Sequence, residues 1–372
     1  MSAKSEICQN QNAQDEQLKQ IVADHYDLGE LLTISKIPKG MVNQSYKIET
    51  LKHGKKEVYL FRHYHPQTTP AQIRFEHALL IELQRRNFAL APQLIERRNG
   101  KSYLKTSHYV AIFSFLSGES KYEWNTPLST QEEFGHVAKE LAFYHQTISG
   151  WKSSCHKPKF IAQIPAMMSR WRDIVRVYPI AKSSFERYFL AHYNYLNDVA
   201  VKLKQRFDEK LVYRLPEIAV HGDYHAGNLL FQDDQVSGIL DFNHSNIDYR
   251  LFDIGLALMY FCANLHNAND EHLSWSKIED FLRSYQQAWR GVAADSDSVQ
   301  IGSLNRDELR LLPEMILAAV FFDLDWLVND YYTNQPNTDL YLPDLQHFVR
   351  MTRWVEAHWH ELAVDFILED ER

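Results

Sequence analysis

The chain has 372 residues, of which 45% are hydrophobic and 24% are charged, and its formal net charge is −8 at pH 7. This composition is typical of a globular protein, and the length exceeds the ~100–200 residues of most single domains, so we expect two domains. The negative net charge argues against nucleic-acid binding, which requires clustered Lys and Arg. No apolar run reaches the ~18 residues that a membrane-spanning helix needs.

Neither the first residues nor the cysteines indicate an exported protein. Residues 1–14 are polar and predict a flexible tail, with no apolar segment of the kind that a secretory signal contains. Cys8, Cys155 and Cys262 are widely spaced, which fits neither a disulfide framework nor paired zinc ligands. We therefore expect a cytoplasmic protein with reduced thiols and no membrane partner, either a monomer or a homodimer.

Residues 15–117 are predicted to form a small antiparallel sheet with two helices. Apolar residues recur at helical spacing over 15–28, and Thr69 followed by Pro70 is typical of an N-cap and a first helical position, so a second helix is expected up to Asn87. Five strands are predicted from alternating apolar residues between turn-forming segments, at 31–37, 44–49, 58–64, 102–105 and 109–116.

Residues 118–372 are predicted to be mainly helical, which makes the chain an α+β protein. Thr130 and Glu133 have the spacing of a capping box at the start of a helix. Four further helices are expected, at 160–176, 182–208, 276–290 and 306–332. A short β-like segment at 218–241 interrupts them and contains a probable turn at Asp233-Asp234.

That β-like segment contains the polar residues that phosphoryl transfer requires. It reads His221-Gly-Asp223-Tyr-His-Ala-Gly-Asn228, and Asp241-Phe follows at the end of the next apolar run. In protein kinases, H-R-D-x-x-x-x-N followed by D-F-G supplies an aspartate that orients the acceptor hydroxyl and two oxygen ligands for Mg²⁺. We therefore predict Asp223 as the catalytic base and Asn228 and Asp241 as Mg²⁺ ligands; the alternative is that these residues only form turns.

The same segment resembles the Brenner-type motif of the aminoglycoside phosphotransferase and choline kinase superfamily, and the run from Gly238 to Ile254 is most similar to the homoserine kinase branch. The resemblance implies a two-lobe protein-kinase-like fold with ATP and Mg²⁺ as cofactors. A five-stranded N-lobe over 15–117 would cover the nucleotide. A larger helical C-lobe over 118–372 would carry the catalytic loop and the acceptor site.

In the N-lobe, the resemblance implies that the loop containing Gly40, Asn43 and Ser45 contacts the nucleotide phosphates. An ordinary hairpin turn is the alternative, because the motif G-x-G-x-x-G is absent. Phe115 lies in the segment that would connect the lobes and border the adenine.

The basic residue of the third strand departs from the family pattern. Arg62 stands where a lysine is expected to reach the α- and β-phosphates. Arginine keeps the positive charge but is not interchangeable with lysine. Its predicted partner is Glu76 on the following helix; otherwise both are solvated charges.

Further residues of the C-lobe are predicted to support the catalytic loop or to bind the acceptor. His221, His225 and Asp253 are expected to brace the catalytic loop. The acceptor candidates are four residues within one predicted helix, any of which could meet a cationic amine: Asp323, Asp325, Trp326 and Asp330. A solvated acidic helix face is the alternative explanation.

The function predicted from the sequence is transfer of the γ-phosphate of ATP to a hydroxyl group of a small metabolite. The acceptor could be an amino alcohol, a homoserine-like amino acid, or an aminoglycoside or sugar. Two alternatives remain open, a protein Ser/Thr kinase and a catalytically silent kinase-like module that binds a nucleotide or a partner.

Overall fold

The computed structural model describes residues 16–38, 43–153, 156–208, 215–263, 272–290, 302–334 and 338–363. The chain divides into two compact units, Met1–Ser117 and Gly118–Arg372. No helix within these described ranges is long and apolar enough to cross a membrane. The predicted tail at 1–14 lies outside the described residues, as do Cys8 and Cys155, whereas Cys262 is a buried free thiol.

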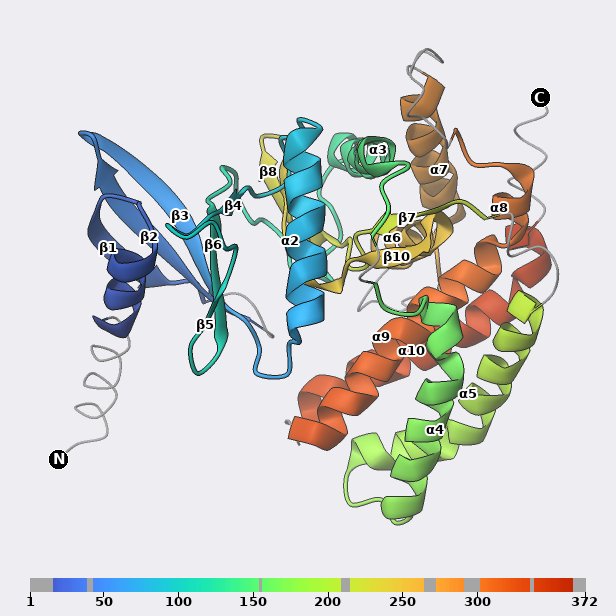
Figure 1. The fold of residues 1–372 in the computed structure, drawn as a ribbon. Coiled ribbons are helices and arrows are strands. Elements are labelled where there is room, and N and C mark those ends of the chain that lie inside the picture. The colour runs from blue at the N-terminus through green and yellow to red at the C-terminus, as the bar shows by residue number, and fades with distance from the viewer. Residues whose placement is uncertain are drawn as a thin grey trace. The chain divides into compact units, whose positions relative to one another are not determined.

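A six-stranded antiparallel sheet forms the frame of the first unit (Figure 1). Its order is β1-β2-β3-β6-β4, and β5 pairs with β6. The strands are β1 (Glu30–Lys36), β2 (Gln44–Lys52), β3 (Lys55–His63), β4 (Leu94–Ile95), β5 (Leu104–Lys105) and β6 (Tyr109–Ser114). The sequence predicted five of these strands. It missed β4, which has two residues and shows no alternation; β5 is equally short but was predicted within the run 102–105.

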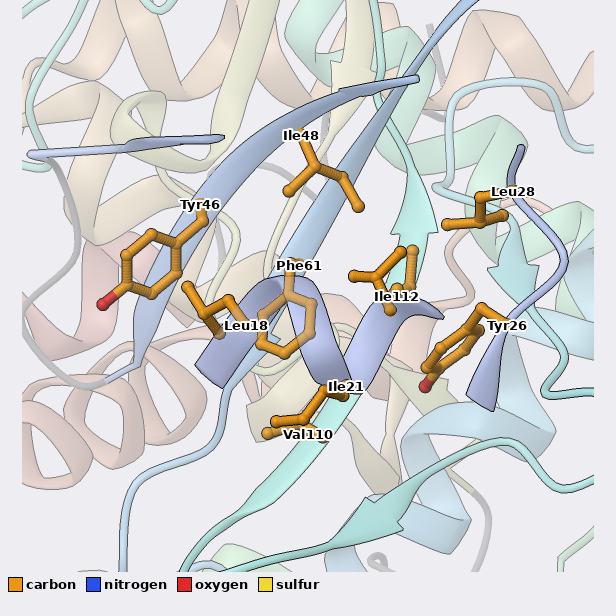
Figure 2. Close-up of a cluster of buried hydrophobic side chains, with 10 residues drawn as sticks. Leu18, Ile21, Tyr26, Leu28, Tyr46, Ile48, Phe61, Val110 and Ile112 are labelled. Carbon is orange, nitrogen blue, oxygen red and sulfur yellow. The ribbon is translucent and has the colours of Figure 1, made fainter. Parts of the chain in front are cut away.

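A helix over 16–25 packs its apolar side against this sheet (Figure 2). Tyr46 and Ile48 on β2, and Val110 and Ile112 on β6, are spaced by two residues and therefore lie on the same face of the sheet. Burying each large apolar side chain stabilises the fold by about 1.5–3 kcal/mol. The cluster consists of Leu18, Ile21, Val22, Tyr26, Leu28, Tyr46, Ile48, Phe61, Val110 and Ile112.

The second helix of this unit, α2 (Pro70–Arg85), begins as the sequence predicts. Thr69 accepts a hydrogen bond from the backbone N–H of Gln72, whose side chain in turn bonds the backbone N–H of Thr69. This capping box satisfies two N–H groups that the first helical turn leaves without partners. The start of the helix fixes the direction in which Glu76, nearly two turns later, faces.

The second unit is mainly helical (Figure 1). Its helices are α3 (Gln131–Ile148), α4 (Phe160–Val177), α5 (Ser184–Asp208), α6 (Arg250–Cys262), α7 (Trp275–Arg290), α8 (Arg306–Arg310), α9 (Leu312–Asn334) and α10 (Thr338–Ala357). The single helix predicted over 306–332 is in fact α8 and α9, with Leu311 between them. The predictions missed α6 and α10. Every residue of α6 is buried, so it lacks the polar face that reveals helical periodicity, and α10 contains Pro343.

Two short antiparallel strand pairs lie among these helices, where the sequence predicts a β-like segment. β7 (Glu217–Val220) pairs with β10 (Asn246–Tyr249), and β8 (Leu229–Gln232) pairs with β9 (Gln235–Ile239). Asp233, in the turn between β8 and β9, has a positive φ of 55°, a conformation that Asp tolerates better than most residues. The predicted turn at Asp233-Asp234 is therefore confirmed. β7 ends shortly before Asp223 and β9 ends shortly before Asp241, so these strand pairs position both residues of the candidate site.

Candidate active site

The loop after β7 makes a turn that requires glycine. Gly222 has a φ of 77°, and a Cβ atom added there would lie 2.6 Å from the backbone oxygen of His244. Any other residue would therefore combine left-handed strain with a steric clash. The turn directs the chain from β7 toward Asp223.

His221 connects the start of this loop to the end of β9. Its Nε2 lies 2.9 Å from the backbone oxygen of Leu240, and its Nδ1 lies 3.2 Å from the backbone nitrogen of Asp223. Burial lowers the pKa of His221, so the ring is neutral, with Nε2–H donating to Leu240 and Nδ1 accepting from Asp223. One side chain thus ties Asp223 to the residue that precedes Asp241.

Asp253, on α6, holds the loop through its backbone. Its two carboxylate oxygens accept hydrogen bonds from the backbone N–H groups of His221, at 2.6 Å, and Gly222, at 2.8 Å. Burying an ionised carboxylate is costly unless such donors surround it. Asp253 is fully buried, so it orients the loop from the protein interior.

A second buried histidine completes this arrangement. His145 on α3 lies with Nε2 3.1 Å from Asp253 Oδ2 and with Nδ1 2.8 Å from the hydroxyl of Tyr285 on α7. Burial lowers the pKa of His145 despite the opposing effect of Asp253, so the neutral ring donates through Nε2 and accepts from Tyr285. The sequence analysis missed His145 and Tyr285, because nothing distinguishes them from other core residues of amphipathic helices.

Asp223 and Asn228 meet at the other side of the loop. The side-chain nitrogen of Asn228 donates to the backbone oxygen of Asp223 at 2.9 Å and to Asp223 Oδ2 at 2.8 Å. His225 Nε2 lies 3.4 Å from Asp223 Oδ1. Burial by itself would raise the pKa of Asp223, but the neighbouring His225 outweighs burial and the pKa is lowered. Asp223 is therefore an ionised carboxylate held in one orientation.

Asp241 is brought to this group by the β8–β9 pair. The backbone N–H of Leu240 donates to the backbone oxygen of Asn228 at 2.8 Å, and Leu229 pairs with Ile239. Asn228 precedes β8 and Asp241 follows β9, so the pairing places their backbones at the same end of the hairpin. Asp241 adopts a left-handed conformation, with φ 61° and ψ 66°. Asp adopts this conformation more readily than most residues, as Asp233 does in the β8–β9 turn, and here it turns the chain sharply at the end of β9.

The donor set fits a hard divalent cation that is shared with phosphate groups. The contacts of Asn228 with Asp223 use its amide nitrogen, so its amide oxygen points away from Asp223. Mg²⁺ keeps several waters and takes one or two protein carboxylates together with phosphate oxygens. Among the described residues, no group of three or more His, Cys, Asp or Glu side chains could hold a metal by itself. The carboxylate of Asp241 and the amide oxygen of Asn228 match this coordination pattern of Mg²⁺.

In the first unit, Arg62 and Glu76 form the predicted ion pair. Arg62 Nη1 lies 2.9 Å from Glu76 Oε1, and the two side chains are 8% and 3% exposed, so these residues are not solvated charges. Tyr64 donates its hydroxyl to Glu76 Oε2 at 2.7 Å, and His77 Nε2 lies 2.9 Å from that hydroxyl. Burial, with a smaller effect of Arg62, lowers the pKa of His77 to about 3, so this histidine is neutral.

The other residues predicted to contact the nucleotide have different surroundings from one another. Gly40 lies outside the described residues. Asn43 is buried and its side-chain oxygen accepts a hydrogen bond from the backbone N–H of His65. Ser45 on β2 pairs directly with Arg62 on β3, and Phe115, just after β6, is exposed beneath the ammonium group of Lys47.

The four acceptor candidates on α9 have different surroundings. Asp325 accepts hydrogen bonds from Arg170 and from the indole N–H of Trp171, and Asp330 accepts from Tyr341 and Asn334. Trp326 is exposed. The contacts of Asp325 and Asp330 join α9 to neighbouring elements, which argues against an acceptor role for these two residues.

Asp323 stands apart from the other three candidates. Tyr260 on α6 donates its hydroxyl to Asp323 Oδ2 at 2.5 Å. The pKa of Asp323 is raised to about 7, first by burial, against the effect of the Tyr260 hydrogen bond, and further by the negative charge of Asp223. The ring of Tyr260 also contacts that of His225, which lies beside Asp223, so Asp323 is connected to the catalytic loop through two side chains.

Comparison with known proteins identifies similar sequences over most of the chain. Residues 33–299 match the phosphotransferase enzyme family. The chain is similar to homoserine kinase from Methylobacillus flagellatus, with 26% identity over 347 residues that cover 90% of this chain and 94% of that protein. It is 25% identical to homoserine kinase from Bradyrhizobium sp. (strain ORS 278) over 89% of this chain and 90% of that protein. These alignments confirm the predicted superfamily.

Solved structures are similar to this chain over nearly its whole length. Aminoglycoside phosphotransferase from Alicyclobacillus acidocaldarius superposes with a TM-score of 0.59 at 14% identity, covering 92% of this chain and 96% of that one. Amicoumacin kinase hAmiN, in complex with AMP-PNP, Ca²⁺ and Ami, gives 0.64 at 13% identity, covering 92% and 93%. A choline/ethanolamine kinase family protein from Mesorhizobium loti gives 0.60 at 13% identity, covering 94% and 97%. The predicted kinase-like α+β fold is confirmed.

Proposed function

We propose that this chain, which belongs to the phosphotransferase enzyme family and is a small-molecule kinase of that family, transfers the γ-phosphate of ATP to the side-chain hydroxyl of homoserine. The observation that carries this proposal is the grouping of Asp223, Asn228 and the strand end that bears Asp241. An acidic residue that orients a hydroxyl, beside two oxygen ligands, is the minimum that phosphoryl transfer from ATP requires.

Asp223 acts on the acceptor. Its lowered pKa keeps it ionised, so it accepts a hydrogen bond from the acceptor hydroxyl and orients the oxygen toward the γ-phosphorus. A bond forms between that oxygen and the γ-phosphorus, while the bond from this phosphorus to the β–γ bridging oxygen breaks and ADP leaves. The hydroxyl proton passes to Asp223 as the new O–P bond forms; a carboxylate of low pKa is a weak base, so this transfer follows orientation, which suits the loose transition state of phosphoryl transfer.

Asn228 and Asp241 would hold Mg²⁺ through the amide oxygen and the carboxylate. The bound ion supplies positive charge that neutralises the phosphate oxygens. The hydrogen bonds of Asn228 to Asp223 keep the amide turned so that its oxygen points away from the catalytic carboxylate. His221 and Asp253 maintain the spacing between the two sides of the site through the loop backbone.

The first unit contributes to nucleotide binding in this proposal. Arg62 is fixed by its buried pairing with Glu76, and its guanidinium group would supply positive charge to the phosphate oxygens. Asn43, Ser45 and Phe115 would then lie along the nucleotide, with residues 15–117 acting as the nucleotide-covering domain and 118–372 as the catalytic domain. Cytoplasmic location fits an enzyme that depends on ATP.

Homoserine is proposed as the acceptor because the similarity to two homoserine kinases extends over about nine-tenths of both chains. The purified chain should form ADP and O-phosphohomoserine from MgATP and homoserine. Choline, ethanolamine, a hexose and an aminoglycoside, assayed at equal concentration, should give lower kcat/KM values. A higher value for any of these would reassign the acceptor. ADP formation no faster than in the acceptor-free control, with every compound, would favour the silent nucleotide-binding module.

A further inference from the structure

We propose that Asp323 and Tyr260 form a subsite for a primary ammonium group of the acceptor, next to the catalytic Asp223. This inference rests on the proposed function and specifies how the same site recognises its substrate. Among the four acidic or aromatic candidates on α9, it assigns the role to Asp323 alone, together with a tyrosine that the sequence analysis did not identify.

A chain of contacts within the second unit connects this subsite to the catalytic loop. Tyr260 on α6 donates to Asp323 on α9 at 2.5 Å. The ring of Tyr260 lies edge-on to that of His225, with 5.2 Å between ring centroids. His225 Nε2 lies 3.4 Å from Asp223 Oδ1. The carboxylate proposed to bind the amine and the carboxylate proposed to orient the hydroxyl therefore belong to one cluster.

The electrostatics of Asp323 favour a cationic ligand. Within the described part of the chain, Asp323 forms no salt bridge to a lysine or arginine, whereas Asp325, two residues later, pairs with Arg170. The hydroxyl of Tyr260 supplies one neutral hydrogen bond to a carboxylate that burial and the nearby Asp223 both destabilise in its charged form. A bound ammonium group would add a positive charge to that of His225, and so would further stabilise the ionised carboxylate.

The geometry suits an acceptor with a short separation between amine and hydroxyl. The amine nitrogen and the hydroxyl oxygen of homoserine are four bonds apart, at most about 5 Å, given bond lengths of ~1.5 Å. Asp323 is linked to Asp223 through Tyr260 and His225, by the 2.5 Å hydrogen bond, the 5.2 Å ring contact and the 3.4 Å pair described above. We expect a small amino acid such as homoserine to reach both carboxylates. The ring of Trp124 lies edge-on to that of Tyr260, with 6.3 Å between ring centroids.

The test compares two acceptors that differ only in the amine, homoserine and 4-hydroxybutanoate, with wild type and Asp323→Asn. The wild type should have a KM for homoserine that is lower by about 10- to 100-fold than its KM for 4-hydroxybutanoate, the range for a hydrogen bond to a charged group. Asp323→Asn should remove most of this difference and leave the KM for ATP unchanged. Tyr260→Phe should reduce the difference less, because it deletes the hydroxyl and retains the carboxylate.

Asp330→Asn is the matched control, since it makes the same change on the same helix at a residue that bonds Asn334 and Tyr341. It should retain the wild-type preference between the two acceptors. If Asp323→Asn weakens both acceptors equally, Asp323 only joins α6 to α9 and the subsite is refuted.

Calorimetric titration of both compounds into the ADP-bound enzyme separates the subsite from the reaction. A wild-type enzyme that binds homoserine more tightly than 4-hydroxybutanoate but forms no O-phosphohomoserine would overturn the proposed acceptor and retain the ammonium subsite. The same comparison with ethanolamine and ethylene glycol extends the test to other amines. If neither amine binds more tightly than its amine-free counterpart, the subsite is refuted whatever the reaction.

Discussion

Arg62 in the antiparallel sheet and Asp223 in the catalytic loop are both held in place by buried polar groups, but by opposite means. Arg62 is paired directly with the carboxylate of Glu76, so the residue that holds Arg62 in place also balances its charge. Asp223 has no such direct balance from an arginine or lysine in the described ranges. Its loop is oriented by Asp253, which binds backbone N–H groups.

The difference has a chemical reason. A residue that only binds phosphate can share its charge with a supporting carboxylate, because arginine has further N–H donors to offer. A residue that must accept the proton of a hydroxyl needs its own carboxylate uncommitted to a strong cation. Support through the backbone fixes the loop, and the carboxylate itself contacts the neutral amide of Asn228 and the ring of His225. Changes near Asp223 should therefore affect kcat, and changes near Arg62 should affect nucleotide binding.

The largest expected effect is that of Asp223→Ala. Loss of the group that orients and accepts the acceptor proton should lower kcat by about 10²–10⁴-fold, with little change in the KM for ATP. Steady-state kinetics with ADP detection measures both constants. Asp233→Asn, an exposed position in the β8–β9 turn, is the control. Near-normal turnover by Asp223→Ala would exclude the assigned role.

Asp253→Asn tests support through the backbone. The amide can accept at only one of its two terminal atoms, so one of the two backbone N–H groups that Asp253 now binds should lose its acceptor. We expect a loss of about 1–3 kcal/mol in the free energy of unfolding for that donor, together with a lower kcat. Urea titration followed by circular dichroism gives the stability. A variant with unchanged stability and turnover would mean that the loop is held by other contacts.

Asp241→Ala should weaken nucleotide binding only when Mg²⁺ is present. Removing one charged ligand is expected to lower the affinity for MgATP by about 10- to 100-fold, the equivalent of ~1.5–3 kcal/mol. Calorimetric titrations with Mg²⁺ and with EDTA provide the comparison, and the parent enzyme in EDTA is the control. Equal losses under both conditions would remove Asp241 from the metal site.

The acceptor KM should depend on pH through Asp323. Its pKa is raised to about 7, mainly by burial, so the carboxylate is neutral below that pH and cannot balance an ammonium group. The KM for homoserine should therefore be about tenfold higher at pH 6 than at pH 8, in proportion to the ionised fraction. The groups that act on Asp323 are Tyr260, through its hydrogen bond, and Asp223, His225 and Asp344, through their charges. Asp323→Asn should flatten the profile; an unchanged slope would assign it to another of these groups.

Arg62→Lys should have the smallest effect. Lysine keeps the charge and matches the residue that the superfamily pattern expects, but its single ammonium group cannot bond Glu76 and phosphate with the same fixed geometry. We expect the KM for ATP to rise about fivefold, equivalent to ~1 kcal/mol, with kcat nearly unchanged. Glu76→Gln serves as the companion variant. A large fall in kcat with unchanged KM would contradict the assignment of Arg62 to binding.

The sequence alone predicted the residues proposed to carry the chemistry, because phosphoryl transfer restricts both residue type and order. Asp223, Asn228 and Asp241 were identified from their spacing, and Arg62 with Glu76 from the superfamily pattern. Local elements followed from local physics: the capping box of Thr130 and Glu133 is present at the start of α3, as predicted. Such features depend on neighbours within a few positions, so they can be recognised without the fold.

Only the tertiary structure decided which residues support that chemistry. His145 and Tyr285 come from helices that are distant in the sequence from the loop they steady, and α6 showed no periodicity because all its faces are buried. Asp323 and Asp325 are two residues apart on α9, yet one bonds Tyr260 and the other pairs with Arg170. Adjacent positions on a helix face different neighbours, and those neighbours are set by packing between helices, which spacing along the chain does not encode.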